Sequence, residues 1–165
     1  MSYRTKYHEL IDKLIEGIVK HYRNRLVSVA IFGSIAKDTF RPDSDIDILL
    51  VVVPLANGRI KRVREFEARV EDRLTGEFKK LSAEGIHPVL SPIIKTPEEV
   101  SQGSPLFLDM TESVKIYYDK DEFLQRYLLS LTARLKRLGA RKVFYKGGYY
   151  WILKPDYQPG EIIEL

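Results

Sequence analysis

Two aspartates stand at alternate positions where a long apolar run begins. Asp45 and Asp47 flank Ile46, and the run continues from Ile48 to Val53. Side chains alternate between the faces of a β-strand, so both carboxylates are expected on one face, about 6.6 Å apart along the chain. Carboxylate oxygens at this spacing can share Mg²⁺, a hard cation that prefers oxygen ligands. We therefore predict that Asp45 and Asp47 are catalytic residues that bind Mg²⁺.

A candidate phosphate-binding turn precedes the aspartates. The apolar run Leu26–Phe32 ends at Gly33 and Ser34. Glycine lets the backbone approach a phosphate closely, and the amides that open a short helix favour anions. We expect Gly33 and Ser34 to hold a triphosphate, with Lys37 and Ser44 as further nucleotide-binding candidates. An exposed lysine often contacts nothing specific, and Ser44 can instead order its own loop.

Together these residues form a pattern suited to phosphoryl transfer, in which metal ions bridge the phosphates and stabilise the attacking and leaving oxygens. The pattern is Phe32-Gly33-Ser34, a gap of nine residues, and Ser44-Asp45-Ile46-Asp47 at the start of an apolar strand. It resembles the signature of the DNA polymerase β-like nucleotidyltransferase superfamily, in its minimal bacterial and archaeal form, over roughly residues 5–95. The resemblance implies that the chain binds a nucleoside triphosphate with Mg²⁺, transfers a nucleoside monophosphate and releases pyrophosphate.

One departure from the family pattern concerns a third acid. The resemblance implies a third carboxylate on the following strand, where it helps to activate the acceptor hydroxyl. No Asp or Glu lies between Gly85 and Pro97, and the expected position falls near Ser91. Either another acid such as Asp109 or Glu112 reaches the site, or only one metal binds well, or catalysis has been lost.

The elements that position these residues follow from apolar spacing. An uninterrupted branched run such as residues 46–53 is typical of a central strand covered on both faces, whereas Pro88 and Pro92 favour a strand at the sheet edge. The predicted helices are Tyr3–Asn24, Arg59–Ser82, Leu106–Glu112 and Phe123–Leu138, and the predicted strands are Leu26–Phe32, Ile46–Val53, Ile86–Ile94 and Val114–Tyr118. We expect an α+β fold, a mixed β-sheet with helices packed against it, followed by a C-terminal helix and a β-hairpin.

The C-terminal segment combines basic and aromatic residues. Two β-rich stretches flank Lys146-Gly147-Gly148, which predicts a hairpin turn. Aromatic side chains beside cations can stack on bases and neutralise phosphates, so nucleic acid is one candidate partner. We favour the alternative, in which Phe144, Tyr149 and Trp151 face inward as a satellite core. The predicted division is a nucleotidyltransferase-like domain over 1–120 and an extension over 121–165 that packs on the same core.

The composition describes a globular chain of 165 residues, 44% hydrophobic and 30% charged, with a net charge of +4. A mild positive charge suits a polyanionic ligand but names no partner. The absence of cysteine excludes disulfides and thiolate-bound metals. No apolar run approaches the roughly 20 residues that span a bilayer, and the N-terminus lacks the apolar core of a signal peptide. We expect a cytoplasmic protein with no membrane partner.

The sequence predicts a Mg²⁺-dependent nucleotidyltransferase that transfers AMP from ATP to an acceptor hydroxyl. The resemblance also implies a protein partner, because minimal members of the superfamily act as antitoxins beside a HEPN-type toxin that some of them modify. The alternative is a catalytically silent nucleotide-binding or partner-binding module, such as an antitoxin-like protein, which the missing third carboxylate favours. The acceptor, the base preference and the oligomeric state stay open at this point.

Overall fold

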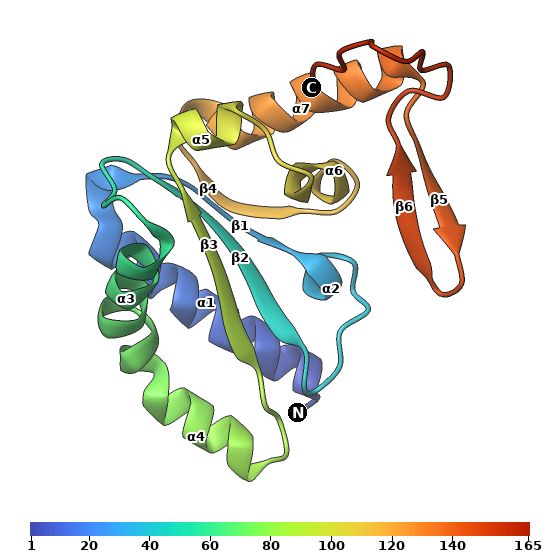
Figure 1. The fold of residues 1–165 in the computed structure, drawn as a ribbon. Coiled ribbons are helices and arrows are strands. Elements are labelled where there is room, and N and C mark those ends of the chain that lie inside the picture. The colour runs from blue at the N-terminus through green and yellow to red at the C-terminus, as the bar shows by residue number, and fades with distance from the viewer.

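The computed structural model describes residues 1–165 and contains a four-stranded mixed sheet in the order β3-β2-β1-β4 (Figure 1). Strand β1 (Leu26–Phe32) pairs antiparallel with β2 (Asp45–Val52) and with β4 (Lys115–Asp119), while β3 (Val89–Lys95) runs parallel to β2. The α+β class with a mixed sheet is therefore confirmed. The strand that the branched run predicts lies in the interior of the sheet.

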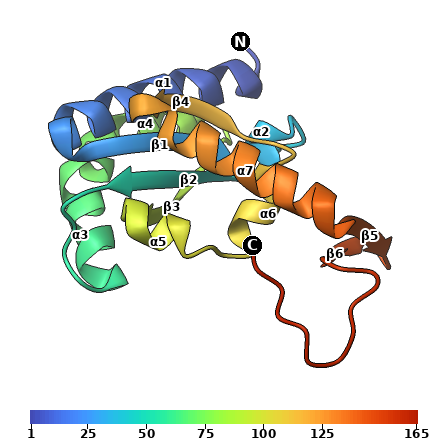
Figure 2. The same ribbon diagram turned by 90° about the horizontal axis from the view of Figure 1, so that it is seen from above.

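Helices cover both faces of the sheet (Figures 1 and 2). The α-helices are α1 (Tyr3–Tyr22), α2 (Gly33–Ala36), α3 (Arg59–Arg69), α4 (Thr75–Ala83), α5 (Pro97–Ser101), α6 (Leu106–Met110) and α7 (Phe123–Leu138), and the 3₁₀ turns are η1 (Arg23–Arg25), η2 (Glu71–Leu74) and η3 (Lys120–Glu122). Side chains of β2 alternate between two core clusters. Ile48 and Leu50 pack with α1, α3 and α4, whereas Leu49 and Val51 pack with α5, α6 and α7. The second face is the one that also carries Asp45 and Asp47.

The predicted single helix Arg59–Ser82 is wrong, because the chain breaks into α3, η2 and α4. Val70 stands at the break with φ −119° and is buried. Its Cγ1 lies 3.8 Å from the place that a Cβ on Gly17 would take, so it packs tightly against α1. Thr75 and Gly76 begin the next helix, and both have low helix propensity. The apolar spacing continues through the break, which is why the sequence pattern did not reveal it.

Strand β3 forms one edge of the sheet, as its prolines predict, although only Pro92 lies within the strand. The carbonyl of Ile94 accepts a hydrogen bond from Nη1 of Arg62 at 3.1 Å. Arg62 lies on α3, so this bond comes from outside the sheet. The open edge of β3 is therefore partly covered by an arginine side chain.

The chain ends in a helix and a hairpin. Helix α7 stops at Gly139, which has φ +71°, and the hairpin follows as β5 (Arg141–Tyr145) and β6 (Gly148–Ile152). Lys146 and Gly147 form the turn with φ of 47° and 78°. Both the helix end and the hairpin are as predicted. The division of the chain near residue 120 stays a prediction.

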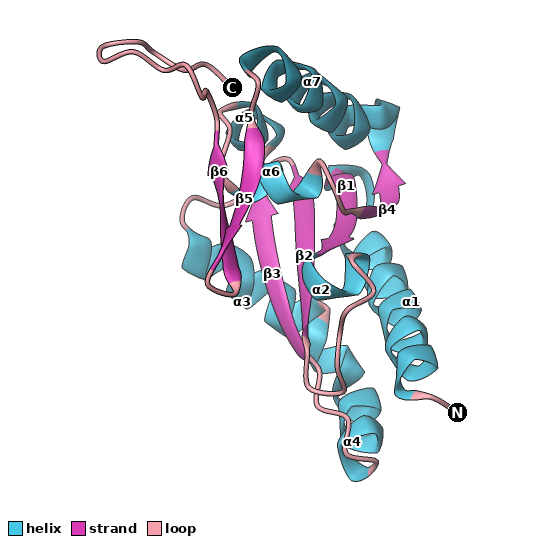
Figure 3. Ribbon diagram, turned by 90° about the vertical axis from the view of Figure 1, so that its right-hand side faces the viewer, coloured by secondary structure: helices cyan, strands magenta, loops and turns pink.

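The prediction that the hairpin's three aromatic residues are buried as a satellite core is wrong for two of them. Phe144 is 76% exposed and Tyr149 is 43% exposed, whereas Trp151 packs against the second core cluster. The hairpin stands beside α2 and α6, clear of the sheet (Figures 1 and 3). Polar groups make most of its contacts with the body of the protein, so its apolar side chains are left in the open. None of the helices combines the length and the apolar character needed to cross a membrane.

Candidate active site

The two aspartates lie where the alternation of β2 predicts. Asp45 is exposed at the first residue of the strand, and Asp47 is half-buried two residues later. Partial burial and the neighbouring charge of Asp45 raise the pKa of Asp47 above its ordinary value, and interaction with the hydroxyl of Ser91 partly offsets the rise. Negative charge is therefore crowded at this end of β2. A bound cation would relieve that repulsion.

Gly33 lies directly against Asp47. Phe32 is the register partner of Asp47, and Gly33 follows with φ +67°. A Cβ at residue 33 would overlap Oδ2 of Asp47 and lie 3.0 Å from its Cγ. The sequence predicts a glycine here for the approach of a phosphate. The structure adds a different reason, because the carboxylate of Asp47 occupies the space of a side chain.

Helix α1 holds the loop between α2 and β2. Oη of Tyr7 donates to the carbonyl of Ser44 at 2.8 Å, and Oη of Tyr3 donates to the carbonyl of Phe40 at 3.0 Å. Burial, with the charge of a nearby aspartate, raises the pKa of Tyr7 to about 12, so it stays a donor. Oγ of Ser44 accepts from the amide of Arg41 at 2.8 Å, so the Ser44 side chain orders its own loop. The sequence pattern did not identify these two tyrosines as residues that hold the loop. The only feature of the sequence that could have indicated them is their spacing of four residues on one face of the helix.

The place implied for a third carboxylate is occupied by Ser91, the register partner of Asp47 on β3. No three His, Cys, Asp or Glu side chains of the chain are arranged to hold a metal. The other acids that the sequence offers are used elsewhere, because Nζ of Lys142 lies 3.5 Å from Asp109 and 3.1 Å from Glu112. Neither acid joins Asp45 and Asp47 in a metal-binding cluster.

Two carboxylates still suit one kind of metal site. Mg²⁺ is usually bound by one or two carboxylates together with substrate phosphates and water, rather than by a cage of protein groups. Asp45 and Asp47 project from the same face, and burial together with the charge of Asp45 raises the pKa of Asp47. These residues therefore fit a Mg²⁺ ion that shares its ligands with a nucleotide.

Lys37, the other predicted nucleotide-binding residue, lies between α2 and the hairpin. Its Nζ is 5.6 Å from the ring centroid of Tyr149 and forms no ion pair. Tyr149 Oη donates to Asp109 at 2.5 Å, and Trp151 Nε1 donates to the same carboxylate at 3.3 Å. Burial opposes ionisation of Asp109, but these two donors and the charge of Lys142 outweigh it and lower its pKa. Asp109 thus anchors the hairpin beside α2.

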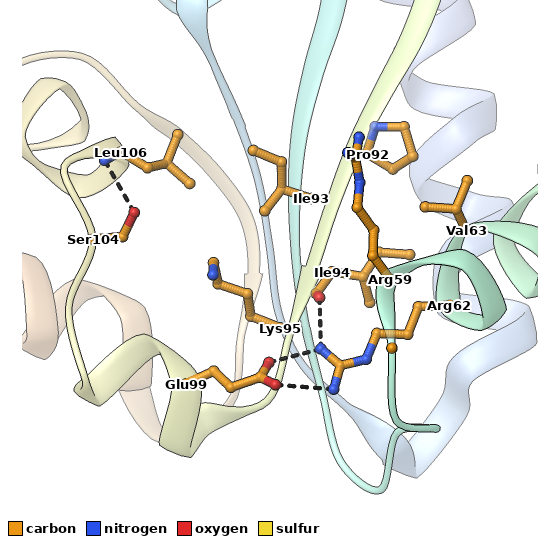
Figure 4. Close-up of a pocket in the computed structure, with 11 residues that line it drawn as sticks. Arg59, Arg62, Val63, Pro92, Ile93, Ile94, Lys95, Glu99, Ser104 and Leu106 are labelled. Atoms are coloured by element: carbon orange, nitrogen blue, oxygen red, sulfur yellow. Dashed lines mark hydrogen bonds and ion pairs between the residues drawn. The ribbon is translucent and has the colours of Figure 1, made fainter.

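A cavity of about 520 Å³ lies at the edge of β3, away from the aspartates (Figure 4). Arg62 crosses it and pairs with both carboxylate oxygens of Glu99, at 2.7 and 2.9 Å. The bond from Arg62 to Ile94 makes this side chain a bridge between α3, β3 and α5. None of the predicted site residues lines the cavity. The guanidinium group of Arg62 in this cavity therefore has a structural role.

Known proteins similar to this chain include a relative in the archaeon Methanocaldococcus jannaschii, named "Putative protein adenylyltransferase MJ1305". It is 29% identical over 133 residues, which cover 79% of this chain and 84% of the relative. A toxin–antitoxin crystal structure with AMP-PNP has a TM-score of 0.46 and 17% identity, over 77% of this chain and 87% of that one. Spectinomycin adenyltransferase AAD(9) from Enterococcus faecialis, with ATP and spectinomycin, has a TM-score of 0.47 and 16% identity, over 78% of this chain and 66% of that one.

The family model described as a nucleotidyltransferase domain matches residues 11–125. The match runs from within α1 into the start of α7 and includes Gly33, Asp45 and Asp47. It confirms the family that the glycine–serine and aspartate pattern resembles. The chain belongs to the nucleotidyltransferase domain family and is a nucleotidyltransferase.

Proposed function

We propose that this nucleotidyltransferase transfers the adenylyl group of Mg²⁺-bound ATP to a hydroxyl of a protein acceptor. The observation that carries the proposal is the placement of Asp45 and Asp47 on one face of β2, directly against the turn at Gly33. The choice of an adenylyl group and of a protein acceptor is supported by the relative in M. jannaschii, which is named for protein adenylylation. A HEPN-type protein is the first acceptor to test.

Each residue of the site has a role in this proposal. Asp45 and Asp47 hold Mg²⁺, which neutralises phosphate charge when it is bound. The hydroxyl of Ser34 and the ammonium group of Lys37 bind the triphosphate, and the Ser44 side chain holds the loop between them and Asp45 in place. The acceptor oxygen attacks the α-phosphorus, the bond from that phosphorus to the bridging oxygen breaks, and pyrophosphate leaves.

The test follows the label from ATP to protein. With wild-type protein, Mg²⁺ and a candidate acceptor, label on the α-phosphate should appear on protein, whereas label on the γ-phosphate should not. The paired change Asp45→Asn with Asp47→Asn should abolish both transfer and the enhancement of ATP binding by Mg²⁺. Asp43→Asn is the matched control, because Asp43 is an exposed acid of the same loop that pairs with Arg41. Transfer that survives in the paired variant would remove the assignment of the metal site.

The second candidate is a nucleotide-binding or partner-binding module without catalysis. One observation favours it, namely that Ser91 stands beside Asp47 where the family implies a carboxylate. Calorimetry and the label-transfer assay together separate the two proposals, because only the transfer of label differs between them. A module would bind Mg²⁺–ATP through Asp45 and Asp47 but transfer no label to any acceptor, including a HEPN-type protein.

A further inference from the structure

Only one of the two faces of the C-terminal hairpin contacts the rest of the protein. Cross-strand partners share a face, so the pairs Lys142–Trp151 and Phe144–Tyr149 place four side chains on one side. Tyr150 pairs with Val143 on the opposite side. We call the first group, Lys142, Phe144, Tyr149 and Trp151, the inner face of the hairpin, because it is the face that contacts the body of the protein.

The inner face borders the candidate active site. Tyr149 meets α6 through its bond to Asp109 and meets the end of α2 through Lys37, whose Nζ lies 5.6 Å from its ring centroid. Lys37 follows Gly33 by four residues, which is about 6 Å of helix rise. In Figure 1 the hairpin lies on the side of the molecule where α2 lies, and in Figure 3 β3 and β2 appear between the two. A triphosphate bound between Gly33 and Lys37 would therefore have the ring of Tyr149 on its Lys37 side.

Phe144 is the residue of the inner face whose position is not explained by contacts with the body of the protein. It is 76% exposed, and its ring lies 6.2 Å from that of Tyr149 at an interplanar angle of 58°. Trp151 and Tyr149 hold the hairpin through Asp109, and Lys142 is held by Asp109 and Glu112. Phe144 shares none of these polar contacts. It thus presents an exposed aromatic surface, with its ring centroid 5.7 Å from Nζ of Lys142, that is connected to the site through Tyr149 and Lys37.

We propose that the hairpin supplies the nucleoside subsite of the donor nucleotide, with Phe144 as the surface on which the base stacks. This inference rests on the proposed function, because it places the base relative to a triphosphate at Gly33 and Ser34. Aromatic side chains stack on any base, and nearby cations attract the attached phosphates. Tyr149 positions the surface by contacting both Lys37 and Asp109.

The surroundings fit a mononucleotide better than a nucleic acid. The charge of Lys142 is already matched by Asp109 and Glu112, so the inner face offers little free positive charge. A long polyanion gains its affinity from many phosphate contacts, each of which releases counterions. Two exposed rings beside one unpaired lysine, Lys37, match one base and one phosphate chain.

The test compares Mg²⁺–ATP with Mg²⁺–tripolyphosphate, which lacks the nucleoside, by calorimetry. Phe144→Ala should weaken ATP binding by about 5- to 150-fold, a stacking contribution of about 1–3 kcal/mol at about 1.4 kcal/mol per tenfold, and leave tripolyphosphate unchanged. Phe144→Trp should retain or tighten ATP binding. Tyr150→Ala is the matched control, because Tyr150 is 51% exposed on the opposite face of the same hairpin, and it should bind both ligands as the wild type does.

Four results would overturn the inference. Unchanged ATP affinity in Phe144→Ala, while the paired aspartate variant loses it, would refute the subsite but spare the proposed function. Equal losses for ATP and tripolyphosphate would mean that the hairpin only supports the phosphate turn. Normal ATP binding together with lost, salt-sensitive RNA binding in Phe144→Ala would make the inner face a nucleic-acid surface. A wild-type protein that binds neither ligand would remove the proposed function and this inference together.

Discussion

The α-carbon of Gly33 faces the carboxylate of Asp47 so closely that no side chain fits between them. The backbone of Gly33 also has φ +67°, a conformation that side-chain-bearing residues rarely adopt. The two constraints are independent, because one comes from a neighbour and the other from the residue's own backbone. They can therefore be separated by mutation.

Gly33→Ala should destabilise the protein by more than the about 1–2 kcal/mol that a left-handed backbone costs a residue with a Cβ. Gly85→Ala is the control, because Gly85 has φ +76° and nothing within 4 Å of an added Cβ. In the background Asp47→Ala, the cost of Gly33→Ala should fall to that of the control, because the overlapping carboxylate is gone. Denaturant melts of the four proteins form the cycle. Equal costs in both backgrounds would show that Asp47 moves aside freely.

Ser91→Asp should place a third carboxylate beside Asp47 and make stability depend on Mg²⁺. Like charges on neighbouring strands repel, so we expect a loss of about 0.2–1 kcal/mol with a chelator present. Added Mg²⁺ should raise the unfolding midpoint of this variant more than that of the wild type. Ser91→Asn has a similar shape without the charge and should show no such difference. A Mg²⁺ response equal to that of the wild type would mean that Ser91 does not face the metal site.

Tyr22→Phe and Tyr7→Phe should change stability in opposite directions. Both tyrosines are buried on the inner face of α1, but the hydroxyl of Tyr22 has no partner, whereas that of Tyr7 donates to Ser44 at 2.8 Å. Removing an unsatisfied buried hydroxyl should stabilise the protein, and removing the bonded one should destabilise it, each by about 1 kcal/mol. Urea melts would measure both. A destabilised Tyr22→Phe would reveal a partner for that hydroxyl.

The pair Arg62–Glu99 should give the protein an acid-sensitive component of stability. Hydrogen bonds from Arg62 hold the pKa of Glu99 below its usual value of 4.5. A carboxyl with a lowered folded pKa contributes stability that is complete at neutral pH and is lost as pH falls below 4.5 toward the folded value. Because the side chain of Glu99 is itself 36% exposed, solvent screens the pair, and Glu99→Gln should cost up to about 1 kcal/mol at neutral pH and progressively less in acid.

The control for that experiment is Glu77→Gln. Glu77 pairs with Lys13 at 2.9 Å, but the lysine is 51% exposed, whereas the side chain of Arg62 is only 11% exposed. Exposed pairs contribute little, so we expect a change within about 0.5 kcal/mol. Melts from neutral pH to below 4.5 that show the same acid slope in wild type and Glu99→Gln would refute the assignment of Glu99.

The parts of the fold that the sequence predicted are those with a strong local signal. The periodicity of α1, the branched run of β2 and the glycine after α7 each determine their own element. The break at Val70 was missed because the apolar spacing continues through it, and the contact of Val70 with Gly17 joins residues far apart in the sequence. Alternation placed Phe144, Tyr149 and Trp151 on the face that meets the protein, but it could not show that Phe144 and Tyr149 stay exposed there.

The site shows the same limit. Spacing alone brought Gly33, Asp45 and Asp47 together as candidates, and the family match includes all three. It could not reveal that the carboxylate of Asp47 fills the space next to Gly33, nor that Asp109 would be used to hold the hairpin. Both relationships depend on the register of strands and on the position of a helix that the sequence pattern does not specify.

The covered edge of β3 has a consequence for how the protein behaves at high concentration. Alternate residues of a strand direct their backbone groups to the same side, so Pro92 and Ile94 both turn theirs toward the open edge. Pro92 has no N–H to offer, and the carbonyl of Ile94 is already taken by Arg62. A strand from another molecule would find no donor at Pro92 and an acceptor already taken at Ile94, which leaves only the Pro92 carbonyl and the Ile94 N–H at these two residues. The edge is thus partly protected against growth into an intermolecular β-structure, and Arg62→Ala would free the Ile94 carbonyl to accept a bond from another strand.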